Sequence, residues 1–139
     1  MEKEFQNMPR HYVLCFSGSC CRAGECLRHL AAKYGSPEGR IVKAVNNRFA
    51  DGEDCRLYKP KQYVRMAYGM LHMYDDVLAR HIADLRGEIT RSFGNGTYYL
   101  MRNGMRAIKP AEQAFISETF RRYGYDGAVF DRYSDELSW

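Results

Sequence analysis

The sequence lacks any apolar run long enough to cross a membrane or to act as a signal peptide. Its first seven residues, Met1 to Asn7, are mostly charged or polar. We therefore expect a cytoplasmic protein with no membrane partner. Because cytoplasmic thiols are kept reduced, cysteines in such a protein favour metal binding or redox chemistry over disulfide formation.

The motifs of several well-understood enzyme classes are also missing. The sequence contains no H-E-x-x-H, no G-x-S-x-G and no C-x-x-C. Gly94-Asn95-Gly96 has neither the preceding strand nor the following Lys-Ser/Thr of a phosphate-binding loop. Four histidines are present, but nothing ties one of them to a thiol as a catalytic pair requires. We predict no catalytic residues and favour a non-enzymatic protein over a small enzyme that uses a cysteine thiolate or an iron–sulfur centre.

The composition is that of an ordinary soluble protein with a mildly basic balance. Of its 139 residues, 45% are hydrophobic and 27% are charged, and the formal net charge is +4. This length predicts a single domain over residues 1–139. The charge permits a nucleic acid or an acidic protein as partner but requires neither.

Cysteine is the one residue type that is concentrated in a single stretch. Four of the five cysteines fall between residues 15 and 26, and the fifth is Cys55. Zn²⁺ is bound tetrahedrally by four thiolates, and ligands from separate segments can pin a loop to a helix. We predict a structural zinc site formed by Cys15, Cys20, Cys26 and Cys55.

Several alternatives to this ligand set remain open. Cys21 could take the place of Cys20, and His11 or His29 could supply one corner of the tetrahedron. An iron–sulfur cluster also accepts four thiolates. The simplest alternative is that the cysteines are small buried hydrophobic residues with no ligand at all.

Hydrophobic periodicity and turn residues predict an α+β, mostly helical fold. We expect a Cys-rich N-terminal layer over residues 1–59, with short strands at 11–16 and 41–45 and a helix over 23–34. Residues 60–124 should form a helix opened by Pro60, a helix over 77–92 capped by Asp75-Asp76, a hairpin and a closing helix from Pro110. The hairpin prediction rests on Asn103-Gly104, which favours a type I′ turn between residues 98–102 and 105–108. Residues 125–139 hold several apolar rings and should dock onto the body.

This order of elements is similar to the core of a winged helix-turn-helix protein, with the hairpin as wing. In such a protein the predicted helix over 77–92 would lie in the groove of the DNA. Six cationic side chains lie at the end of this helix or after it, and they could contact phosphates or another acidic partner. They are Arg91, Arg102, Arg106, Lys109, Arg121 and Arg122. Mixed charges along residues 80–88 compete with this interpretation, because they are typical of any solvated helix face.

The chain also resembles a family of small bacterial proteins from Bacteroidales that is known only as a domain of unknown function. The likeness runs through most of the chain. It rests on Pro9-Arg10-His11-Tyr12, Cys15, Cys20, Cys26-Leu27-Arg28, Asp54-Cys55, Ala67-Tyr68-Gly69-Met70, Phe93-Gly94, Tyr98-Tyr99, Gly104, Pro110-Ala111-Glu112-Gln113, Phe130-Asp131 and Tyr133. The resemblance implies a cytosolic bacterial protein with no established activity. Members have proline where this chain has Cys21, which implies that Cys21 is the spare cysteine.

Overall fold

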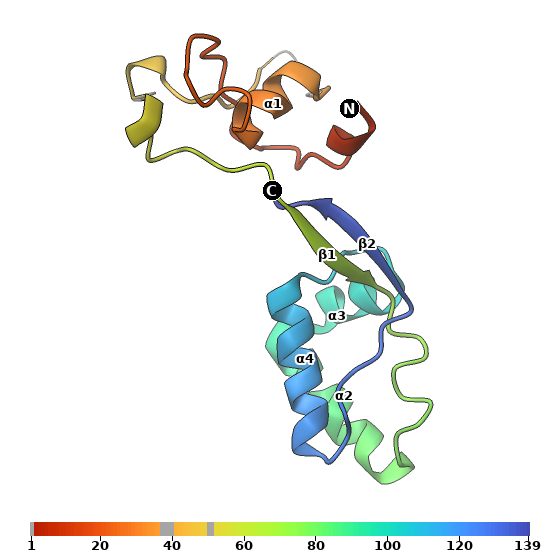
Figure 1. The fold of residues 1–139 in the computed structure, drawn as a ribbon. Helices are drawn as coiled ribbons and strands as arrows, with labels where there is room; N and C mark the ends of the chain where they lie inside the picture. Colours follow the sequence, from red (N-terminus) through yellow and green to blue (C-terminus); the bar gives the residue numbers. More distant parts are fainter. Residues whose placement is uncertain (1, 37–40, 50–51) are drawn as a thin grey trace. The chain divides into compact units, whose positions relative to one another are not determined.

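The computed structural model describes residues 2–36, 41–49 and 52–139 (Figure 1). Within them, four α-helices and one two-stranded antiparallel sheet form an α+β fold, as predicted. In chain order the elements are α1 (Leu27–Tyr34), β1 (Tyr63–Tyr68), α2 (Ala79–Phe93), α3 (Asn95–Arg102), α4 (Pro110–Arg122) and β2 (Arg132–Leu137). None of these helices is both long enough and apolar enough to cross a membrane.

The chain divides into two compact units. Unit 1 consists of Met1–Tyr63 and Leu137–Trp139, and unit 2 consists of Val64–Glu136. Each unit has its own cluster of buried apolar side chains.

Unit 1 has a small core around α1. The buried side chains of this core are Phe5, Leu14, Leu27, Ala31 and Leu137. The helix predicted from residue 23 begins only at Leu27, because residues 20–26 form turns, with the Ala23 amide donating to the Cys20 carbonyl. The two predicted N-terminal strands are reduced to one parallel bridge between Leu14 and Ala44.

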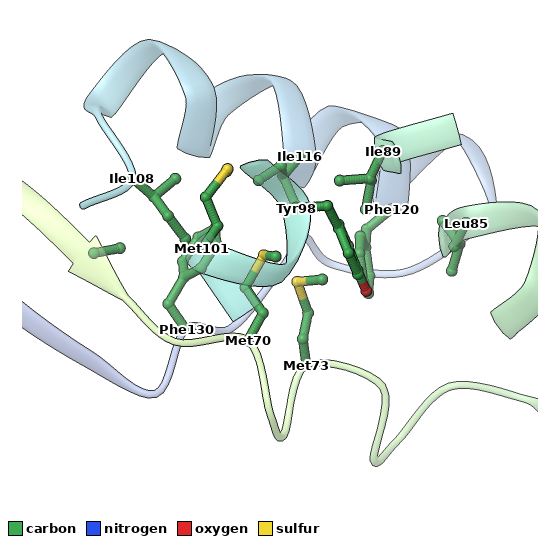
Figure 2. Packing of buried hydrophobic residues seen from close by; sticks show 11 residues of the cluster. Met70, Met73, Leu85, Ile89, Tyr98, Met101, Ile108, Ile116, Phe120 and Phe130 are labelled. Atoms are coloured by element: carbon green, nitrogen blue, oxygen red, sulfur yellow. The ribbon is translucent and has the colours of Figure 1, made fainter. Parts of the chain in front are cut away.

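Unit 2 is built on the helices α2, α3 and α4, whose apolar faces meet in one cluster (Figure 2). Leu85 and Ile89 on α2 and Ile116 and Phe120 on α4 are fully buried and form the inner faces of these two helices. Burial of each such side chain stabilises the fold by about 1.5–3 kcal/mol. Helix α2 begins after Asp75-Asp76, and its N-cap is Leu78, so the predicted acidic cap is not formed.

The prediction of a helix from Pro60 was wrong. Residues 63–68 form β1, and Pro60 lies in an antiparallel bridge with Cys26. Strand β1 pairs with β2, so that Asp131 donates to the Gly69 carbonyl at one end of the pair and Ser138 donates to the Gln62 carbonyl at the other. A short apolar run fits helical and extended periods alike, and here a distant strand partner decides between them.

The prediction of a hairpin over residues 98–108 was also wrong, and the winged-helix order is therefore not formed by these residues. Residues 95–102 form α3, which buries Tyr98 and Met101. A type I′ turn needs positive φ at both central residues, but φ of Asn103 is −83° and only Gly104 is positive, at 73°. Asn103-Gly104 instead ends α3 in a Schellman motif, in which the Met105 amide donates to the Leu100 carbonyl.

Candidate metal centre

The four predicted ligands line a single small cavity in unit 1. Cys15, Cys20 and Cys26 come from one stretch of the chain and Cys55 comes from another, and the cavity volume is about 20 Å³. A site that holds one water molecule needs roughly 10–15 Å³ on the same measure, so this cavity has the size of one small ion. Its remaining lining residues are Ser17, Ala23, Arg28, His29, Val45, Gly52, Leu57 and Tyr58.

Backbone hydrogen bonds hold Cys15 and Cys20 on one side of the cavity. Cys15 follows the Leu14–Ala44 bridge, and its amide donates to the Arg28 carbonyl at 3.1 Å. Cys20 lies in a turn, with its amide 3.4 Å from the Ser17 carbonyl. These contacts fix one turn-forming loop beside the start of α1.

The second side is a loop that reaches the cavity from residues 52–58. Gly52 has φ of +59°, a conformation that favours glycine, and its carbonyl accepts from the Cys55 amide at 3.3 Å. Arg28 donates through Nε to the Leu57 carbonyl at 2.9 Å, and the Arg22 guanidinium lies 3.2 Å from the centroid of the Tyr58 ring. The two arginines therefore tie the Cys55 loop to the segment that carries the other cysteines.

Cys26 occupies the N-cap of α1, and its side chain makes no capping hydrogen bond. The first turn of a helix has unpaired amide donors, which an acceptor at the N-cap can satisfy. The residue is also largely buried, with 8% of its surface exposed. Its position suits a metal-bound thiolate better than an ordinary helix cap.

Of the two other candidate ligands His29 and Cys21, only His29 lines the cavity. His29 lines the cavity, and its Nδ1 is buried without a hydrogen-bond partner among the described residues. Cys21 is exposed and is not among the lining residues, and His11 is exposed as well. An unpartnered buried nitrogen costs about 1–3 kcal/mol, so His29 is the histidine with a reason to contact a ligand.

The five cysteines are free thiols, and their sulfur atoms do not already form a coordination sphere. Within residues 2–36, 41–49 and 52–139, no three Cys, His, Asp or Glu side chains are arranged so that they could hold one metal ion. The donor chemistry nevertheless fits Zn²⁺, which takes four thiolate sulfurs at about 2.3 Å. Coordination would require the four sulfur atoms to approach one another.

The six cationic residues predicted to contact a partner lie in unit 2, and half of them are used inside the molecule. Arg106 makes a two-pronged ion pair with Glu112 at 2.8 and 3.1 Å. Arg122 lies 2.7 Å from Glu88, and Arg121 lies 3.4 Å from Glu118. Among the described residues, the other three have no carboxylate partner within ion-pair distance; they are Arg91, Arg102 and Lys109.

Sequence reasoning missed the residues that hold the cavity together. Arg22 and Arg28 bind backbone carbonyls of the Cys55 loop and of Val13, and neither was predicted to have this role. Their positions beside Cys21 and Leu27 carried no signal of this role, because the loop that they bind is about 30 residues away in sequence.

The chain belongs to DUF6078, a family of unknown function whose sequence model matches residues 1–139. No curated protein and no solved structure matches the chain.

Proposed function

We propose that this is a non-enzymatic binding protein of the bacterial cytoplasm, of the Bacteroidales type, whose unit 1 is built around one Zn²⁺ ion. The ligands are Cys15, Cys20, Cys26 and Cys55. One observation carries the proposal: these four cysteines converge on one ion-sized cavity, whereas the fifth, Cys21, does not line it.

The small core of unit 1 supports a structural role for the metal. Five side chains make up its buried cluster, and several of its segments are turns and single bridges rather than regular elements. Small units with so little core are commonly stabilised by a metal or by disulfides. Because thiols are kept reduced in the cytoplasm, disulfides are not expected there, and a metal ion is the remaining means of stabilising unit 1.

Four cysteines can hold either a single Zn²⁺ ion or an iron–sulfur cluster. Zinc suits this site because it accepts four thiolates and needs no redox role.

Metal analysis of the purified chain tests the proposal. We expect one zinc per chain, and we expect a chelator to unfold unit 1, seen through the fluorescence of the single tryptophan, Trp139. Cys26→Ser and Cys55→Ser should lower the zinc content, and Cys21→Ser is the matched control that should keep it. A folded chain without metal would overturn the proposal, and iron with visible absorption would favour the iron–sulfur enzyme instead.

The partner in this proposal is a protein or a nucleic acid with acidic groups, in keeping with the net charge of +4. In unit 2, Arg91, Arg102 and Lys109 are the members of the cationic set that are not held by carboxylates in the described residues. Arg106, Arg121 and Arg122 contribute less, because a partner would have to compete with their ion pairs.

A further inference from the structure

The positive charge of the chain resides in unit 1. Unit 1 contains 11 Lys and Arg against 7 Asp and Glu, whereas unit 2 contains 10 of each. The net charge of +4 therefore belongs to the unit that carries the cysteine cavity, and the cationic stretch of unit 2 is balanced by carboxylates elsewhere in the same unit.

The cations of unit 1 are also largely free of ion pairs. In its described residues the one ion pair joins Lys61 to Glu4 at 2.7 Å. Arg22 and Arg28 hold backbone carbonyls, as described above. The exposed cations without a carboxylate partner there are Lys3, Arg10, Lys33, Lys43, Arg48 and Arg56.

Two of these cations lie beside the cavity together with two exposed apolar side chains. Phe16 stands between Cys15 and Ser17, which both line the cavity, and it is 53% exposed. Leu57 lines the cavity itself and is 42% exposed. We call Phe16, Lys43, Arg56 and Leu57 the rim surface.

Backbone contacts show why the two cations belong to this surface. The Lys43 carbonyl accepts from the Leu14 amide at 2.9 Å, which places Lys43 beside the strand segment that leads to Cys15 and Phe16. Arg56 is covalently bonded to Cys55 and Leu57, both of which line the cavity. An exposed aromatic ring and unpaired cations thus belong to the chain segments that line one site.

We infer that the rim surface binds single-stranded nucleic acid, with a base stacked on Phe16 and phosphates held by Lys43 and Arg56. An exposed ring can stack only on an unpaired base, because the faces of paired bases are covered in a duplex. Cationic grooves with aromatic platforms are the usual means of binding single strands without sequence preference. The ring adds a stacking contact to the two cations, and binding of an acidic protein instead is an outcome of the test below.

This inference rests on the proposed function, because the metal would hold the two loops that carry Phe16 and Arg56 in place. Binding to so few groups should be weak and strongly dependent on salt. Each phosphate contact to a single strand contributes about 0.7 to the slope of log affinity against log salt. Loss of Lys43 and Arg56 together should lower that slope by about 1.4.

The test is fluorescence anisotropy of a labelled oligothymidine of about 12 nucleotides with the full zinc-loaded chain at low salt. Phe16→Ala should weaken binding by about fivefold or more, the loss of one stacked base. The double variant Lys43→Ala/Arg56→Ala should weaken it further and flatten the salt dependence. The matched control, Lys3→Ala/Arg80→Ala, removes two exposed positive charges outside the rim surface and should bind as the wild type does.

Zinc content and thermal unfolding are measured on every sample, so that the inference and the proposed function fail separately. A zinc-loaded chain that does not bind the oligonucleotide at low salt overturns the inference and leaves the zinc site standing. A second outcome also overturns the inference, in favour of an acidic protein partner. In it, Phe16→Ala binds the oligonucleotide as tightly as the wild type does, and polyglutamate competes with the oligonucleotide equally well for both. A zinc-free chain that still binds through Phe16 overturns the proposed function and supports the surface.

Discussion

The carboxylate of Asp131 occupies the space that a side chain on Gly69 would need. A Cβ on Gly69 would lie 2.9 Å from the Asp131 Cβ and closer still to its Oδ2. The same carboxylate accepts hydrogen bonds from the amides of Leu71 at 2.9 Å and His72 at 3.2 Å. Gly69 and Asp131 thus fix the place where the chain leaves β1 and where β2 approaches it.

Gly69→Ala should destabilise unit 2 strongly. The substitution forces an L side chain into φ of +82° and against Asp131, and the first of these effects alone costs about 1–2 kcal/mol. We expect a total loss of about 2 kcal/mol or more in urea unfolding followed by circular dichroism. The control is Gly87→Ala within α2, where nothing lies near the new methyl group and the helix should gain about 0.5–1 kcal/mol. A loss at Gly69 no larger than at an ordinary surface site would contradict this account.

Gly104→Ala should cost less than Gly69→Ala. Gly104 has φ of +73° in the Schellman motif of α3, but a Cβ there meets only ordinary contacts, the nearest at 3.8 Å. The cost should therefore be the conformational part, about 1 kcal/mol. Equal losses at the two glycines would show that Asp131 does not crowd Gly69. The measurement is the same urea titration.

The helix α4 should make unit 2 sensitive to acid through Glu112. Burial would raise the pKa of this carboxyl, but hydrogen bonds from Arg106 and from the Lys109 amide outweigh it and lower the pKa below its ordinary value of 4.5. The resulting stability is fully present above about pH 4.5 and is lost as the pH falls through the lower folded-state pKa.

Glu112→Gln should remove this dependence. We expect a loss of about 2 kcal/mol at neutral pH, since hydrogen bonds to charged groups contribute more than neutral ones. The difference from the wild type should shrink as the pH is lowered toward 3. Glu118→Gln is the control: its ion pair with Arg121 is exposed and should change stability by about 0.5 kcal/mol at most. A constant difference across this pH range would refute the assignment.

Tyr12→Phe should be neutral or stabilising in unit 1. The Tyr12 hydroxyl is buried without a hydrogen-bond partner among the described residues, and burial raises the pKa of the phenol. Its ring keeps the edge contact with Trp139, whose centroid lies 4.9 Å away. Tyr63→Phe is the contrasting variant, because the Tyr63 hydroxyl donates to Glu4 at 2.7 Å and its removal should destabilise. Unfolding followed by Trp139 fluorescence gives both values, and a marked loss in Tyr12→Phe would reveal a partner for its hydroxyl.

The helices α2 and α4 of unit 2 could be predicted from the sequence because their signals are local. The spacing of Leu85 and Ile89, and of Ile116 and Phe120, places each pair on one helix face, and Pro110 marks the start of α4. The prediction extended too far at Leu78, which lies before α2 and is 54% exposed. Element type was thus better defined than element boundaries.

The sheet could not be predicted because its two strands are 63 residues apart in the chain at their nearest ends. Nothing near Tyr68 indicates Arg132 as a neighbour, and local periodicity alone suggested a helix. At Asn103-Gly104 the dipeptide was recognised as a turn signal, but the same two residues also end helices. Tyr98 and Met101, three residues apart and both buried, decide in favour of the helix.

The cysteine set was accessible to sequence reasoning because chemistry, rather than periodicity, identified it. The clustering of the cysteines left Cys20 and Cys21 as alternatives, and the family resemblance selected Cys15, Cys20, Cys26 and Cys55, all four of which line the cavity. The arrangement around them was not accessible, since it depends on Arg28 reaching the Leu57 carbonyl across the fold. The location of unpaired positive charge could not be predicted either, because it depends on the ion pairs that Arg106, Arg121 and Arg122 form in the fold.

The closing segment of the chain is shared by both cores: Phe130 is buried in unit 2, whereas Leu137 is buried in unit 1 and Trp139 packs against Phe5 there. During synthesis on the ribosome, the core of unit 2 therefore cannot be completed before Phe130 has emerged, nor the core of unit 1 before Leu137 has emerged. The N-terminal residues of unit 1 are therefore translated long before the residue that completes their core, Leu137.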